Sequence, residues 1–112
     1  MPVRQLLYLR HGGQVAASQT GLEVAAARMP KSGRVRSVHL FARAVSGTVT
    51  VDIHKNDVSI LTAVITPTAG SQIAGSLDLS KTAFTNGDEI QMKVTTAASS
   101  TLDDGAVSLY LA

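Results

Sequence analysis

Seven residues near the middle of the chain decide the fold class: Thr48-Val49-Thr50-Val51-Asp52-Ile53-His54. Apolar side chains alternate with polar ones, so Val49, Val51 and Ile53 share one face of an extended chain. The opposite face carries threonine, aspartate and histidine, which suit contact with water. The stretch therefore predicts a β-strand with one buried side and one wet side.

Two further stretches repeat this alternation and predict strands. Their inward residues are Ile90, Met92 and Val94 in the range 89–95, and Val107, Leu109 and Leu111 in the range 106–111. Residues 34–45 predict a longer strand, in which Val35 falls out of phase with Val38 and Leu40. A bulge near Arg36 would bring the two parts into phase.

The remaining apolar stretches are less regular. Residues 58–66 are β-branched and apolar on both faces, which predicts a strand covered on both sides. Residues 72–79 predict a strand that turns Ile73, Leu77 and Leu79 to one face, with a weak point or bulge at Gly75. Residues 3–9 and 22–28 complete a set of about eight strands, although residues 23–28 suit a short helix equally well.

Turn-forming residues separate these stretches. They include Lys55-Asn56-Asp57, Pro67-Thr68-Ala69-Gly70, Thr85-Asn86-Gly87-Asp88 and Asp103-Asp104-Gly105. The small, polar residues 11–21 are expected to form a loop or a linker. Without a long amphipathic helix, this pattern predicts an all-β fold, an antiparallel sandwich or barrel.

Composition narrows the classes of protein. The chain has 112 residues, of which 45% are hydrophobic, and it has no cysteine. These values favour one compact domain and exclude intrinsic disorder, a disulfide scaffold and cysteine catalysis. The apolar part of the N-terminus, about five residues, is too short for a signal peptide or a membrane span. Residues 1–56 hold eight Lys/Arg against two Asp/Glu, whereas residues 57–112 hold two against six.

Sites for chemistry are few in this sequence. Asp52, His54 and Asp57 are interpreted as solvent-facing residues at a hairpin end rather than as metal ligands. His11-Gly12-Gly13 is not accompanied by a G-x-S-x-G nucleophile elbow, and Gly-rich phosphate loops do not occur. We therefore expect a protein that is not an enzyme and holds no cofactor and no metal. With four Phe and Tyr residues in all, a nucleic-acid partner is not expected either.

One row of residues favours a protein contact instead. His39, Phe41 and Arg43 share the outward side of the strand at 34–45, and Tyr110 faces outward near the C-terminus. Exposed aromatic, histidine and arginine side chains are typical of interface cores. The sequence thus predicts a subunit contact at this row.

From about Met29 to Ala112 the sequence resembles the small jelly-roll β-sandwich modules of tailed-phage virion proteins, which include head decoration (cement) proteins, head fibres and fibre tips. Residues 33–40, 47–56 and 84–94 carry the resemblance. The last of these, a Gly-Asp turn followed by an alternating strand, is similar to a strand entry common to trimeric jelly rolls. The resemblance covers three quarters of the chain and rests on turns and alternation, which specify fold better than role.

The resemblance implies a non-enzymatic structural protein of a bacteriophage virion, with an antiparallel jelly-roll-like β-sandwich of about eight strands. The short chain favours a capsid decoration (cement) protein that binds and stabilises the capsid lattice. Its implied partners are the major capsid protein and further copies in a homotrimer, without nucleic acid or membrane. It would be made in the host cytoplasm and act on the capsid exterior. The alternative is a fibre-tip or receptor- or carbohydrate-binding jelly-roll module.

The chain is expected to divide at residue 28. Residues 1–28 would form an N-terminal arm or strand-exchange segment, and residues 29–112 the β-sandwich domain. The arm could add a strand to a capsid protein or to a neighbouring subunit. The residues expected to contact the capsid or another subunit are Val3, Leu6, Leu7, Tyr8, Arg10, His39, Phe41, Arg43 and Tyr110.

Overall fold

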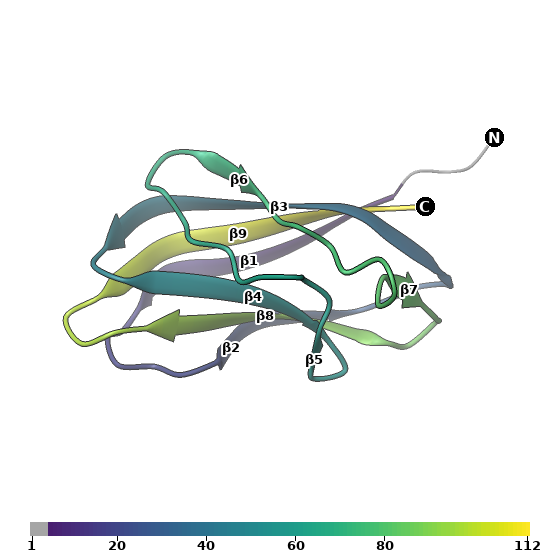
Figure 1. Cartoon of the computed structure of the whole chain (residues 1–112), viewed down its shortest axis with the longest axis horizontal. Helices are drawn as coiled ribbons and strands as arrows, with labels where there is room; N and C mark the ends of the chain where they lie inside the picture. Colours follow the sequence, from purple (N-terminus) through teal and green to yellow (C-terminus); the bar gives the residue numbers. More distant parts are fainter. Residues whose placement is uncertain (1–4) are drawn as a thin grey trace.

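Nine strands in two facing antiparallel sheets make up residues 5–112, the part of the chain that the computed structural model describes (Figure 1). The strands are β1 (Gln5–Val15), β2 (Leu22–Arg28), β3 (Gly33–Ser46), β4 (Val49–Lys55), β5 (Val58–Ser59), β6 (Gln72–Ala74), β7 (Ala83–Phe84), β8 (Glu89–Thr96) and β9 (Thr101–Leu111). Helices are absent from these residues, so none is available there to cross a membrane. The all-β prediction is confirmed.

The strand order is that of a jelly roll. One sheet runs β1-β9-β3-β6, with the short β7 paired to the start of β3, and the other runs β2-β8-β4-β5. The first half of the chain therefore pairs with the second half: β1 with β9, β2 with β8, β3 with β6 and β4 with β5. This is a long two-stranded ribbon folded over into two Greek keys.

In this ribbon, the opposite charges of the two halves of the sequence are brought side by side. Because the cationic first half lies beside the anionic second half, opposite charges meet across the strands. Arg43 on β3 pairs with Asp104 on β9, and Arg28 on β2 lies 4.0 Å from Glu89 on β8. The two halves thus offset each other's charge instead of forming two charged lobes.

The core lies between the sheets and is built from the predicted inward faces. Every inward residue of the three alternating stretches is buried: Val49, Val51, Ile53, Ile90, Met92, Val94, Val107, Leu109 and Leu111. The strand at 34–45 also behaves as predicted. Val35 lies opposite Leu111 but Ser37 lies opposite Tyr110, so Arg36 is the extra residue of a bulge.

Residues 58–66 depart from the predicted strand. Only Val58 and Ser59 pair regularly, as β5. A single bridge between Ile65 and Val51 of β4 follows before the chain reaches β6 in the other sheet. A crossing segment cannot keep a continuous ladder, so single side chains alternate irregularly between core and solvent. Ile60 and Ile65 are buried, whereas Val58 and Val64 are half exposed. In the same way β6 ends at Ala74, and Leu79 is exposed rather than inward.

Residues 5–28 are built into both sheets. β1 and β2 pair with β9 and β8 of the same chain, and residues 23–28 form a strand instead of a helix. β1 continues through the predicted loop as far as Val15, with a bulge between His11 and Gln14. Leu9 and Val15 are core residues. Exchange of this segment with a neighbouring molecule stays a prediction, and Val3 lies outside the described residues.

Candidate interaction surface

The outer side of the β1-β9-β3-β6 sheet carries four exposed apolar side chains and the half-buried ring of His39, which we together call the aromatic face: Leu6, Tyr8, His39, Phe41 and Tyr110. The strand register brings them together. Leu6 lies opposite Tyr110, and Tyr8 and His39 flank the same residue of β9, Ser108. Since outward and inward side chains alternate along each strand, core packing of the intervening residues fixes the orientation of this face.

Exposure distinguishes this face from the rest of the surface. Leu6 and Tyr8 are 52% and 56% exposed, and Phe41 and Tyr110 are 43% and 44% exposed. Large apolar side chains with this exposure, grouped on one sheet face, mark a contact site more often than scattered single residues do. Four of the eight large hydrophobic residues that are exposed in the described chain lie on this one face.

Small residues between the aromatic ones shape the face. Ser108 and Ala106 of β9 lie opposite His39 and Phe41, so each large ring of β3 has a small side chain beside it on β9. The rings of His39 and Tyr110 meet edge to face, with centroids 6.0 Å apart. This arrangement holds the two rings in a defined orientation while leaving Tyr110 accessible.

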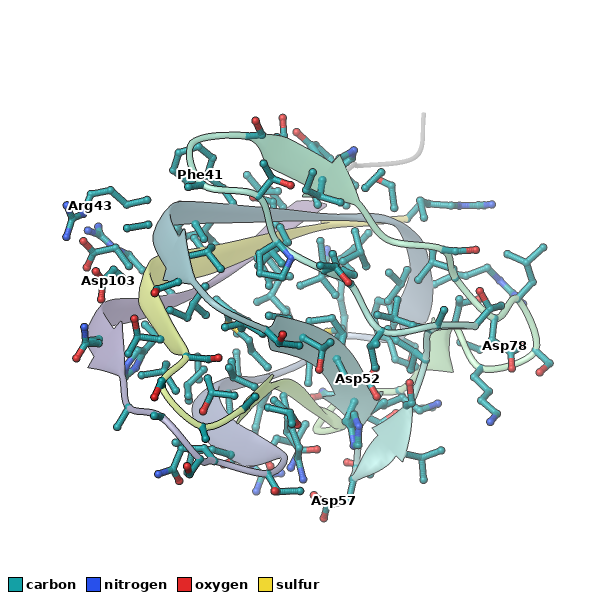
Figure 2. All side chains as sticks on the ribbon, turned by 60° about the vertical axis from the view of Figure 1, so that its left-hand side comes forward. Phe41, Arg43, Asp52, Asp57, Asp78 and Asp103 are labelled. Atoms are coloured by element: carbon teal, nitrogen blue, oxygen red, sulfur yellow. The ribbon has the colours of Figure 1, made fainter. Side chains whose placement is uncertain are left out.

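Arginines border the aromatic face. Arg10 follows Tyr8 on the outward side of β1, and Arg43 follows Phe41 on β3, as Figure 2 shows for the latter pair. The Arg43 guanidinium pairs with Asp104, whose Oδ1 also accepts a 2.7 Å hydrogen bond from Gly13 N at the β1 bulge. The Gly13 hydrogen bond, together with Arg43, lowers the pKa of Asp104 below its ordinary value, and Asp104 raises the pKa of Arg43.

The structure brings together most of the residues that the sequence suggested for an interface. Leu6, Tyr8, Arg10, His39, Phe41, Arg43 and Tyr110 all lie on this side of one sheet. Leu7 does not, because it alternates to the inner side and packs against the core. Sequence reasoning missed Ser108 and Ala106, which the period-two pattern around Tyr110 could have placed on the same side.

The outer side of the other sheet has a different character. Gln91 is buried there, and its Nε2 lies 2.7 Å from Glu23, 2.9 Å from Asp57 and 2.8 Å from Glu89. Lys93 Nζ donates to Asp57 at 3.0 Å. These hydrogen bonds lower the pKa of Asp57, with the bond from Lys93 contributing most. The acidic groups of this side are therefore held by partners within the chain.

The loose metal site considered for Asp52, His54 and Asp57 is not assembled. Asp52 Oδ2 lies 3.0 Å from His54 Nε2, and Ser59 Oγ donates to Asp52 Oδ1 at 2.7 Å. Asp57 points to Gln91 and Lys93 instead. Among residues 5–112, no three His, Cys, Asp or Glu side chains are grouped as metal ligands.

Two of the predicted turns, at residues 55–57 and 85–88, lie against each other. Asn56 Nδ2 donates to Asp88 Oδ1 at 3.1 Å, and Asn56 Oδ1 accepts from Glu89 N at 3.0 Å. The second oxygen of Asp88 accepts from Thr85 N at 2.9 Å. Because their amide and carboxylate groups bind each other, these turns are better suited to fixing the end of the sandwich than to holding a sugar.

Comparison with known proteins gives similarity in structure but not in sequence. No protein-family model matches the chain, and no curated protein resembles it in sequence. Among solved structures, the chain is similar to a chain from the capsid of Ralstonia phage GP4, with a TM-score of 0.60 and 15% sequence identity. The similarity covers 97% of this chain and 84% of that chain. A likeness at this identity shows that the two share a fold.

Proposed function

We propose that this chain is a non-enzymatic structural protein of a bacteriophage virion, of the capsid decoration type, and that it attaches to the capsid through the aromatic face. The observation that carries the proposal is the shared fold over 97% of the chain with a phage capsid chain. The resemblance of residues 29–112 to virion jelly rolls points to the same class from the sequence alone.

The aromatic face supplies the kind of contact that a decoration protein needs. Capsid binding has to place the module on a preformed protein surface, and burial of exposed apolar area is the main favourable term in such association. Tyr8, Phe41 and Tyr110 offer large, stiff side chains that lose little entropy on binding, and Arg10 and Arg43 border them. Aromatic anchors with an arginine margin are typical of energetically important interface residues.

The consequence for the virion is mechanical. A protein that binds only the assembled shell stabilises that shell by mass action. Many copies, each bridging adjacent shell subunits, add their contacts over the whole lattice. We expect the major capsid protein to be the partner and the capsid exterior to be the location.

A pair of lysine variants tests the use of the aromatic face. Phe41→Lys places a charge in the centre of the face, and Ala26→Lys places the same charge on the exposed outer side of the other sheet, where Ala26 lies opposite Gln91. We expect F41K to weaken binding to capsids of the source phage at least 10-fold and A26K to bind as the wild type does. Equal binding by the two variants, both folded by circular dichroism, would rule out this face as the contact.

A further inference from the structure

The four edges of the two sheets are not equally protected. β5 and β6 are edges of two and three residues, too short to pair with another strand over any length. β2 is interrupted by a register shift between Glu23 and Ala25 and carries charges near both ends. Short, bulged and charged edges are the usual protections against pairing between molecules. β1 is different, because within residues 5–112 the regular stretch Gln5–His11 pairs with β9 alone.

The direction of the backbone groups shows which residues of β1 have a free side. Val38 O accepts a hydrogen bond from Gly75 N at 2.9 Å, so the backbone of Val38 points away from β9. Its register partner on β9 is Leu109, whose backbone N–H and C=O groups therefore point to β1. Leu109 lies opposite Leu7, so the N–H and C=O of Leu7 point to β9.

The residues that alternate with Leu7 direct their backbone N–H and C=O groups away from the sheet: Leu6, Tyr8 and Arg10. Two of these three side chains belong to the aromatic face, and Arg10 borders it. A row of unpaired backbone donors and acceptors beside exposed apolar side chains is a template for strand addition.

We propose that two copies of this chain pair antiparallel through β1, with Tyr8 of one copy opposite Tyr8 of the other. The regular stretch Gln5–His11 is centred on Tyr8, so this register uses its whole length. Leu6 then exchanges backbone hydrogen bonds with Arg10 of the second copy, and Arg10 with Leu6. The two sheets join into one continuous sheet.

The side chains of β1 favour a second copy as the occupant. Residues 5–15 contain no acidic residue and a single arginine, and the register sets Arg10 against Leu6 rather than against the other Arg10. The two tyrosines form a cross-strand aromatic pair, and Leu7 lies opposite Leu9 on the inner side. Pairing also joins the aromatic faces of the two copies, so Leu6 and Tyr8 move from the margin of one face to the centre of a doubled one.

A matched pair of variants tests this edge. Tyr8→Lys brings two like charges opposite each other across the two-fold axis, whereas Phe41→Lys adds the same charge to the same face two strands away from the edge. By light scattering, we expect the mass of two chains for the wild type and F41K, and half that mass for Y8K. A wild type with the mass of one or three chains, or a Y8K variant with unchanged mass, would overturn the proposal.

Cross-linking tests the register without depending on Y8K. The chain has no cysteine, so Tyr8→Cys introduces a single thiol. Hydrogen-bonded antiparallel partners have Cα atoms about 5.5 Å apart, within the range that a disulfide spans. We expect Y8C to form covalent dimers under mild oxidation and Phe41→Cys to stay single; equal yields from both variants would contradict the register.

The pairing does not depend on the proposed function, and the two can fail separately. A capsid-binding monomer would leave the virion role intact and remove the edge contact. A dimer that ignores capsids would do the reverse. The pairing also predicts two chains where the resemblance to virion jelly rolls implies three, so one mass measurement separates them.

Discussion

Asp104 connects three strands with one side chain. It lies on β9, accepts from Gly13 N on β1 and pairs with Arg43 on β3. It also holds the margin of the aromatic face, because it fixes one of the arginines that border Phe41. Its left-handed backbone, with φ near 50°, is tolerated by aspartate better than by most residues.

The lowered pKa of Asp104 gives a prediction with a definite sign. A carboxyl whose pKa is lower in the folded protein than in the unfolded chain adds stability above the ordinary value of 3.8, and this stability is lost as the pH falls through the lowered value. We expect Asp104→Asn to lower the melting temperature at pH 7 and the gap to the wild type to close in acid. Asp103→Asn removes the same charge from the preceding residue and should lower the melting temperature less. A difference in melting temperature that stays constant as the pH falls from 7 to well below 3.8 would contradict this account.

Two glycines with nearly the same φ allow backbone strain to be separated from steric crowding. Gly47 and Gly70 have φ of 73° and 71°, but a Cβ on Gly47 would lie 2.2 Å from Ser100 Oγ, and one on Gly70 would meet nothing within 4 Å. Ser100 Oγ accepts from Thr48 N, so moving it breaks a hydrogen bond. We expect Gly70→Ala to cost about 1 kcal/mol and Gly47→Ala about 2 kcal/mol or more in the free energy of unfolding. Urea titrations of both variants check this order, and equal costs would refute it.

At the scale of the strands, alternation was enough to predict which side chains are buried. It placed Val49, Val51 and Ile53 correctly and located the bulge at Arg36, because one wrong register would move every side chain to the other face. It failed at residues 58–66, where the chain crosses between sheets and burial depends on which core gap each side chain meets. Composition cannot show that geometry.

The candidate surface was predictable in part for a similar reason. The outward row of β3 follows from local period alone, so His39, Phe41 and Arg43 were found together. That Leu6 and Tyr8 join Tyr110 depends on pairing of β1 with β9, about 100 residues away in sequence. Such long-range pairing leaves no local pattern, so Leu7, which packs against the core, could not be separated from Leu6 and Tyr8 among the expected contact residues.

Substitutions at two neighbouring residues of β3 allow effects on stability and on binding to be measured separately. Leu40 is fully buried, and Phe41 is 43% exposed on the opposite side of the strand. We expect Leu40→Ala to cost about 2–5 kcal/mol in the free energy of unfolding and Phe41→Ala no more than about 1 kcal/mol. Capsid binding should fall for F41A although the fold is kept. If F41A destabilised the protein as much as L40A, Phe41 would be a packing residue rather than a contact residue.

At the scale of the whole molecule, the two outer sides of the sandwich differ in polarity. The side with Gln91 satisfies its carboxylates within the chain and suits contact with water. The side with the aromatic face leaves apolar area uncovered. A jelly roll with one polar outer side and one apolar outer side is suited to lie on another protein surface, which under the proposed function is the capsid.

Attachment to the capsid can be measured by co-sedimentation with purified capsid shells of the source phage. The wild-type protein should pellet with the assembled shells and reach a plateau at a fixed number of copies per shell. Folded protein that remains in the supernatant at every concentration of shells would contradict a capsid-decorating role and favour a receptor-binding module.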